Sequence, residues 1–178
     1  MSLSFSYILA LDPGLTGTGW ALFDAQKRIL LRTNVFFPQR GEGRGHYLNG
    51  LKNGASMFRS LIIHEIKGKE FQTQVILEEP TLWSGSALSM SAGTRGDLHK
   101  LSAFFGMLTA TAHINMLSAR AIPVNQWKGQ MSKEAVIHRI KKRYEEHRFH
   151  LAEGEKWVPL QNHSADAIGL GLYVLGVL

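Results

Sequence analysis

The sequence predicts an α/β layer fold built around one mixed sheet. Three apolar, strand-like segments separated by Gly-rich and Asp-containing turns fill the first third of the chain and favour an antiparallel meander. Helix-like and strand-like segments then alternate, which is typical of parallel strands joined by helices. A length of 178 residues, with 44% hydrophobic and 19% charged residues, fits a single globular domain over residues 1–178.

The first elements follow from local patterning. We expect strands at 7–11, 19–23 and 28–37, because each is apolar and bounded by turn residues. Residues 46–67 place apolar side chains near helical spacing and predict a helix, although Gly50 and Gly54 weaken the pattern. The apolar run at 74–78 predicts a fourth strand, which Pro80 ends.

The second half predicts helices and one short strand. Residues 84–96 are polar and rich in Ser and Gly, so we expect a loop there. The apolar segment 97–117 predicts a buried helix, and residues 121–124 predict a strand. Ser132 suits a helix N-cap, with Glu134 in the first turn of a basic helix that reaches about His147. A final helix is expected over 163–178.

Composition and charge narrow the classes of partner. The chain has no cysteine, which excludes disulfide frameworks and Cys-ligated metal sites. Polar residues interrupt every apolar run before the roughly 18 residues that a membrane span needs. The first residues also lack signal-peptide character, so we expect a soluble cytoplasmic protein. The net charge of +6 favours a polyanionic partner, first nucleic acid and second an anionic membrane surface.

Carboxylates stand at three places where a core would not normally hold them. Asp12 ends the first strand, Glu78 and Glu79 end the fourth, and Asp166 lies in the apolar final helix. A buried carboxylate is costly unless it is hydrogen-bonded, paired or bound to a metal. Each acid alone has an ordinary interpretation, such as a turn residue or a strand end that faces water. Together they could converge and hold two divalent cations about 4 Å apart, an arrangement that hydrolyses phosphodiesters.

Three motifs in order resemble those of a known nuclease family. The segments ILALDPGLTGTGW at 8–20, VILE at 75–78 and HSADAIG at 163–169 are similar to the acidic motifs of the RuvC-type Holliday junction resolvases, within the RNase H-like superfamily. The resemblance extends over nearly the whole chain. It implies an RNase H-like fold and a homodimeric crossover junction endodeoxyribonuclease that nicks branched DNA with Mg²⁺ or Mn²⁺, two ions per site. The divergent sequence resembles phage or prophage forms more than housekeeping bacterial ones.

The resemblance also implies a metal site. Asp12, Glu78 and Asp166 match the family's metal-binding acids, and His163 stands where many members have a further Asp and some have His. His163 and Asp166 are three positions apart in the predicted helix, so their side chains share a face. Glu79 is the alternative to Glu78, and only one of the two points into the site if the strand residues alternate.

Basic and aromatic residues are candidates for DNA contact. By resemblance, Lys128 and Lys133 contact DNA near the scissile phosphate. Residues 125–150 carry seven basic residues against three acids, which favours phosphate contact, although a solvated face is the ordinary alternative. Trp83 is a candidate for stacking on bases at a branch point, whereas Trp127 is interpreted as a packing residue. The candidates on the basic helix are Arg139, Lys141 and Lys142.

Other functions fit parts of the pattern. A flap or replication-fork nuclease of the same fold would share the acids, whereas a non-catalytic nucleic-acid-binding member would be expected to have lost them. The segment 12–19 also resembles the phosphate loop of actin-like ATPases and sugar kinases, but 178 residues cannot supply the two domains that these need. Core burial explains most of the apolar helix 97–117, and a homodimer interface would cover any apolar surface left exposed.

Overall fold

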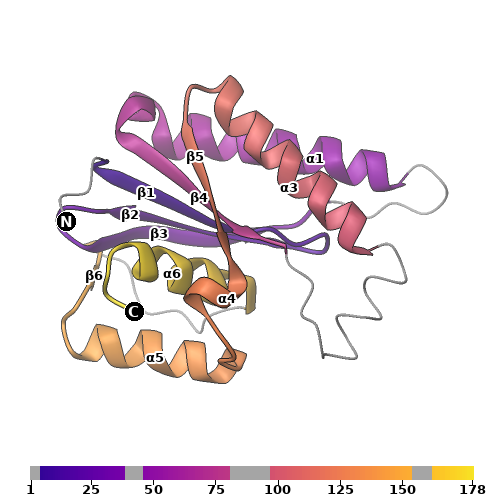
Figure 1. The fold of residues 1–178 in the computed structure, drawn as a ribbon. Helices are drawn as coiled ribbons and strands as arrows, with labels where there is room; N and C mark the ends of the chain where they lie inside the picture. Colours follow the sequence, from indigo (N-terminus) through magenta and orange to yellow (C-terminus); the bar gives the residue numbers. More distant parts are fainter. Residues whose placement is uncertain (1–4, 39–45, 81–96, 154–161) are drawn as a thin grey trace.

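The computed structural model describes residues 5–38, 46–80, 97–153 and 162–178, and the strands in these residues form one six-stranded sheet (Figure 1). Their spatial order is β5-β4-β1-β2-β3-β6. In this order β1, which ends with Asp12, lies next to β4, which contains Glu78. The strands are β1 (Tyr7–Asp12), β2 (Thr18–Asp24), β3 (Ile29–Phe36), β4 (Thr73–Glu79), β5 (Ser118–Pro123) and β6 (His150–Leu151).

The strands pair as a mixed sheet. β2 runs antiparallel to both β1 and β3, whereas β1 with β4, β4 with β5, and β3 with β6 are parallel. The prediction of three antiparallel strands followed by parallel ones is therefore confirmed. β1 and β2 are almost wholly buried. Their sequences are apolar at successive positions because both faces of the sheet are covered.

Helices cover the sheet on both faces (Figure 1). Leu9 and Leu11 of β1 pack into the core beneath α1 and α3, whereas Ile8 and Ala10 pack into the core beneath α5 and α6. Because side chains alternate along a strand, Asp12 belongs to the α6 face together with Ala10. The helices are α1 (His46–Leu61), α3 (Asp97–Ile114), α4 (Val124–Trp127), α5 (Lys133–Glu145) and α6 (Asn162–Val174).

The two longest predicted helices end earlier than expected. The helix predicted over 46–67 is α1 followed by a π-helical turn (Ile62–Ile66) and by Gly68, whose φ is +80°. α3 ends at Ile114 rather than 117, because Met116 has a φ of +59° and a left-handed residue ends a helix. Between Gly68 and β4 the chain forms a single-turn 3₁₀ helix (Glu70–Gln72). The predicted loop at 84–96 lies outside the described residues.

The elements after α3 differ from prediction at their ends. The strand predicted at 121–124 begins at Ser118, and it stops at Pro123 because the chain turns at once into α4. β6 was not predicted, since two residues are too few to show a period. Ser132 is the N-cap of α5, as predicted, and its side chain accepts a hydrogen bond from the Ala135 amide. α6 ends before Gly176, whose φ is +66°.

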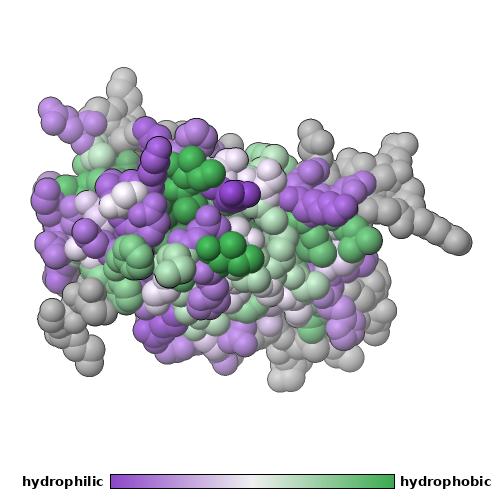
Figure 2. Space-filling view, turned by 90° about the horizontal axis from the view of Figure 1, so that it is seen from above, coloured by the Kyte–Doolittle hydropathy of each residue, from purple (hydrophilic) through white to green (hydrophobic). Residues whose placement is uncertain are grey.

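The face covered by α1 and α3 is mixed in character. Viewed from above, its hydrophobic surface is split into separate patches among hydrophilic side chains (Figure 2). The exposed apolar side chains of the molecule include Ile114 at the end of α3 and Leu48 in α1. Within the described ranges, no helix has the length and apolar character needed to cross a membrane.

Candidate active site

Asp12 and Glu78 lie at the carboxyl ends of two adjacent parallel strands. β1 and β4 pair with Leu11 opposite Leu77, so the next residue on each strand is an acid. Asp166 comes from the first half of α6, which packs across β1 and β2. Open α/β sheets commonly place their ligand sites at such strand ends. The fold therefore brings the three predicted acids to one end of the sheet.

Alternation along β4 separates Glu78 from Glu79. Ile76 packs into the core on the α6 side, whereas Leu77 packs into the core on the α1 and α3 side. Glu78 therefore shares the α6 face with Ile76, and Glu79 projects from the opposite face. A hydrogen bond confirms this side for Glu78, since Nε1 of Trp127, a member of the α6-side core, donates to its Oε2 at 3.0 Å.

The other two acids have basic side chains as partners. Nδ1 of His163 lies 3.0 Å from Oδ2 of Asp12. Nζ of Lys128 donates to Oδ1 of Asp166 at 2.7 Å, and Nζ of Lys133 lies 3.8 Å from its Oδ2. The side chains of Asp12 and Asp166 are only 13% and 10% exposed. Asp12 and Asp166 are therefore buried, Glu78 is half-buried, and each of the three acids has its own partner.

The acids also act on one another electrostatically. Burial raises the pKa of Asp12 above its ordinary value, and the nearby charge of Asp166 raises it further. Burial, followed by the charges of Asp12 and Asp166, raises the pKa of Glu78 from 4.5 to about 8. The hydrogen bond with Asp12 raises the pKa of His163. The three carboxylates thus form one electrostatic unit.

Gly19 allows α6 to approach the sheet closely enough to complete this unit. Gly19 of β2 is the direct cross-strand partner of Asp12. A Cβ atom at this position would overlap the backbone carbonyl of His163 and would lie 2.8 Å from the Ser164 amide. Only glycine therefore lets the first turn of α6 rest on β2, where His163 meets Asp12.

The donor set suits a divalent cation. Carboxylates supply the oxygen ligands that Mg²⁺ prefers, and the imidazole of His163 suits a softer ion such as Mn²⁺. Burial and mutual repulsion favour the protonated forms of Asp12 and Glu78, a cost that a bound cation would relieve. In the part of the chain that is described, however, no three His, Asp or Glu side chains form a ready group for a metal. Binding would require Lys128 to leave Asp166.

The predicted DNA contacts outside this cluster lie further along α5 or beyond the described residues. α5 begins beside the site, where Lys133 reaches Asp166, and runs away from it (Figure 1). Arg139, Lys141 and Lys142 are exposed on this helix. Each of the two lysines also pairs with a glutamate one turn further on, at 3.8 and 3.9 Å. Trp83 lies outside the described residues.

Trp127 is the residue of the site that the sequence interpretation missed. It is buried, as a packing residue would be, but its indole N–H also donates to Glu78. The prediction that Trp127 packs in the core is therefore confirmed, and the hydrogen bond to Glu78 is a contact that the prediction did not include. One sequence feature could have pointed to this contact: Trp127 directly precedes Lys128, which was already a site candidate. Two adjacent residues that follow a strand can both reach the same site.

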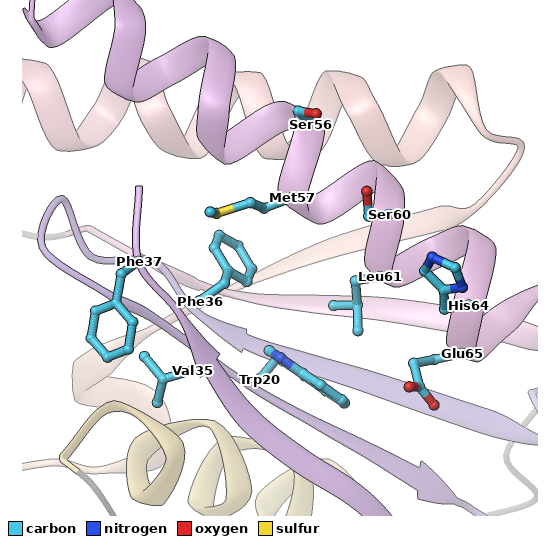
Figure 3. A pocket seen from close by; sticks show the side chains of 10 residues that line it. All are labelled: Trp20, Val35, Phe36, Phe37, Ser56, Met57, Ser60, Leu61, His64 and Glu65. Atoms are coloured by element: carbon cyan, nitrogen blue, oxygen red, sulfur yellow. The ribbon is translucent and has the colours of Figure 1, made fainter. Parts of the chain in front are cut away.

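An open pocket of about 520 Å³ lies on the opposite side of the sheet (Figure 3). It lies between α1 and the strands β2 and β3, and its lining includes Trp20, Phe36 and Met57. None of the predicted site residues lines it. Trp20 is thus a second buried tryptophan, on the face of the sheet opposite to the acids.

Comparison with solved structures identifies the fold. The chain is similar to Thermus thermophilus RuvC in complex with a Holliday junction substrate, with 18% identity, a TM-score of 0.61, and coverage of 93% of this chain and 90% of that chain. It is also similar to a second T. thermophilus RuvC structure, with 17% identity, a TM-score of 0.61, and coverage of 96% and 97%. No family model and no curated protein matches the sequence. The chain therefore has the RNase H-like fold of RuvC, as its motifs predicted.

Proposed function

We propose that this protein is a metal-dependent endonuclease that resolves four-way DNA junctions by hydrolysing phosphodiester bonds. The observation that carries the proposal is that Asp12, Glu78 and Asp166 lie in one electrostatic unit at the end of the sheet, with Asp12 and Asp166 buried. Three acids gathered in this way repel one another when charged, and a bound cation would relieve that repulsion. The likeness to a RuvC structure that holds a Holliday junction substrate supports a branched substrate.

The proposed cofactor is Mg²⁺, with Mn²⁺ as a substitute, at two ions per site. Asp12, Glu78 and Asp166 would hold these ions, with His163 as a further ligand. Two bound ions supply an activated water and stabilise the leaving oxygen of the broken phosphodiester. Of the protein's own groups, His163 orients the Asp12 carboxylate through their 3.0 Å contact. Lys128 neutralises Asp166 in the metal-free protein, and once released from it the ammonium would be free to contact a DNA phosphate.

The basic residues would contact two different parts of the DNA backbone. Lys128 and Lys133, which both reach Asp166, would contact phosphates next to the bond that is cut. Arg139, Lys141 and Lys142 would contact phosphates further along the duplex, because α5 carries them away from the acids. Such outer contacts are released by salt and do not read sequence.

The proposal includes a homodimer that packs through α3. Ala103, Gly106, Ala110 and Ile114 are exposed in the single chain, and their spacing puts them on one side of the helix. A Cβ atom at Gly106 would touch nothing within 4 Å, so this surface is open in the single chain. Small apolar side chains let two helices approach closely, and a two-fold dimer suits two symmetric cuts. Sedimentation of the wild type and of Gly106→Arg tests this: the wild type should be dimeric and the variant monomeric.

The nuclease proposal is tested with a panel of DNA structures. Wild type and Asp12→Asn are incubated with four-way, three-way, flap and linear duplex DNA in Mg²⁺ and in Mn²⁺. The wild type should nick the four-way junction symmetrically and fastest, and the variant should bind it but not cut. Preference for flap or fork DNA would identify the alternative nuclease of the same fold. Cleavage by neither protein in either metal, or equal cleavage by both, contradicts the proposal.

A further inference from the structure

We propose that Trp127 is a positioning residue of the metal site, because its indole N–H fixes one oxygen of Glu78 and leaves the other directed at the site. The inference rests on the proposed metal-dependent function and extends it to a residue that bears no charge. Nε1 of Trp127 donates to Oε2 of Glu78 at 3.0 Å. Oε1 of Glu78 has no such donor among the described residues, so it is the oxygen left for a cation.

The path of the chain brings the indole to this carboxylate. β5 pairs with β4 so that Ile122 lies opposite Glu78. The chain then leaves the sheet at Pro123 and forms the single turn of α4, which ends at Trp127. The ring therefore crosses from the neighbouring strand to the α6 face, where Glu78 projects. This placement depends on β5 and β4 being adjacent.

The indole ring is held on its far side as well. A Cβ atom at Gly169 of α6 would lie 2.7 Å from Cζ3 of Trp127, closer than real Cβ contacts come. The same position faces Val136 of α5, and Trp127 is only 4% exposed. The ring thus lies in a closed space that the absent side chain of Gly169 provides. A donor fixed in this way points in one direction, which is what a preorganised ligand needs.

A neutral donor suits this role better than a cation. Lys128, the next residue, pairs its ammonium with Asp166, and a metal ion must displace this ammonium before it can bind that carboxylate. The indole N–H orients Glu78 without adding a charge that competes with the metal. The hydrogen bond from Trp127 to Glu78 can therefore remain when a cation binds. The ion pair between Lys128 and Asp166 must break.

The test compares two tryptophans that differ in their contact with the acids. Trp127→Phe removes the N–H at the site, and Trp20→Phe removes the indole N–H of a buried tryptophan on the opposite face of the sheet. Mn²⁺ binding is measured by calorimetry without DNA, and the Mn²⁺ concentration for half-maximal nicking is measured with it. Partners of this kind change metal affinity by roughly 10- to 100-fold. We expect at least about tenfold weaker Mn²⁺ binding in Trp127→Phe and wild-type binding in Trp20→Phe.

A second variant keeps the inference testable if Trp127→Phe does not fold. Benzothienylalanine at position 127 has nearly the shape of tryptophan but carries sulfur in place of the N–H, so it should also weaken Mn²⁺ binding. Wild-type Mn²⁺ affinity in the folded position-127 variants would overturn the inference and leave Trp127 with a packing role alone. If the wild type itself binds no Mn²⁺, the proposed function fails and this inference fails with it. If the wild type binds and cuts but the position-127 variants match it, only the inference fails.

Discussion

Replacing Glu78 by Gln should stabilise the metal-free protein, and only at high pH. Glu78 is half-buried beside Asp12 and Asp166, so its charged form is unfavourable in the fold and its pKa rises from 4.5 to about 8. Gln has the same shape and cannot ionise. Its carbonyl oxygen can still accept the hydrogen bond from Trp127. The substitution therefore removes the charge while keeping the packing and the hydrogen bond.

The size and direction of the effect follow from linkage. Between pH 4.5 and about 8 the folded state keeps a proton on Glu78 that the unfolded state has lost, so stability falls as pH rises through this range. The gap between the two pKa values corresponds to a ceiling of about 5 kcal/mol. Water that enters the site recovers part of this cost, so we expect a gain of about 3 kcal/mol above pH 8. For a chain of this length that is a rise in Tm of roughly 6 to 12 °C.

The assay is thermal or urea unfolding in EDTA at about pH 5 and about pH 9. Glu79→Gln is the matched control, because it removes an adjacent carboxylate that projects from the opposite face of the sheet. Glu78→Gln should exceed the wild type in stability at the higher pH and equal it at the lower one, while Glu79→Gln should show no such crossover. An equal gain in both variants, or none in either, would refute the placement of Glu78 among the acids.

Four further substitutions test how the site is built. Gly19→Ala should lower the free energy of unfolding by about 2 kcal/mol and slow nicking, because the added methyl group pushes the start of α6 off β2; melting curves and cleavage rates check this. Lys128→Gln should destabilise the metal-free protein by about 3 kcal/mol yet tighten Mn²⁺ binding. Lys133→Gln should have smaller effects on both stability and Mn²⁺ affinity, because the Lys133 ammonium is 3.8 Å from Asp166 and the Lys128 ammonium is 2.7 Å from it. In calorimetry, equal Mn²⁺ affinities of Lys128→Gln and the wild type would exclude competition by that lysine. His163→Asp should lower the ratio of the Mn²⁺ rate to the Mg²⁺ rate, and an unchanged ratio would place His163 outside the metal site. The hydrogen bond with Asp12 raises the pKa of His163 above 6.5, and a protonated imidazole cannot bind a metal. When pH is lowered, the wild-type cleavage rate should therefore begin to fall before pH 6.5 is reached.

The acids could be predicted because they break local patterns. Asp12 and Glu78 each end an apolar strand, and Asp166 interrupts an apolar helix, so each is visible within a few residues of sequence. The choice between Glu78 and Glu79 needed the register of β4 against both cores, which alternation alone leaves open. The resemblance in three motifs was enough to predict the fold, and the structural comparison confirms it.

The partners of the acids could not be predicted, because tertiary contacts decide them. Trp127 follows an apolar strand and looks like any buried aromatic residue until β5 is placed beside β4. The basic composition of α5 left phosphate contact and a solvated face as alternatives, and the pairing of Lys141 and Lys142 with glutamates depends on side-chain geometry that the sequence does not show. Helix ends such as Met116 were missed because a left-handed residue other than glycine leaves no clear mark in sequence.

The central claim is that Asp12, Glu78 and Asp166 bind divalent cations together, and anomalous diffraction from crystals grown with Mn²⁺ tests it most directly. The account predicts Mn²⁺ peaks in contact with oxygens of all three acids, with the Lys128 ammonium withdrawn from Asp166. It also predicts that the Trp127 N–H still contacts Glu78. Saturating Mn²⁺ with no peak among these acids, or with Lys128 still paired to Asp166, would contradict it.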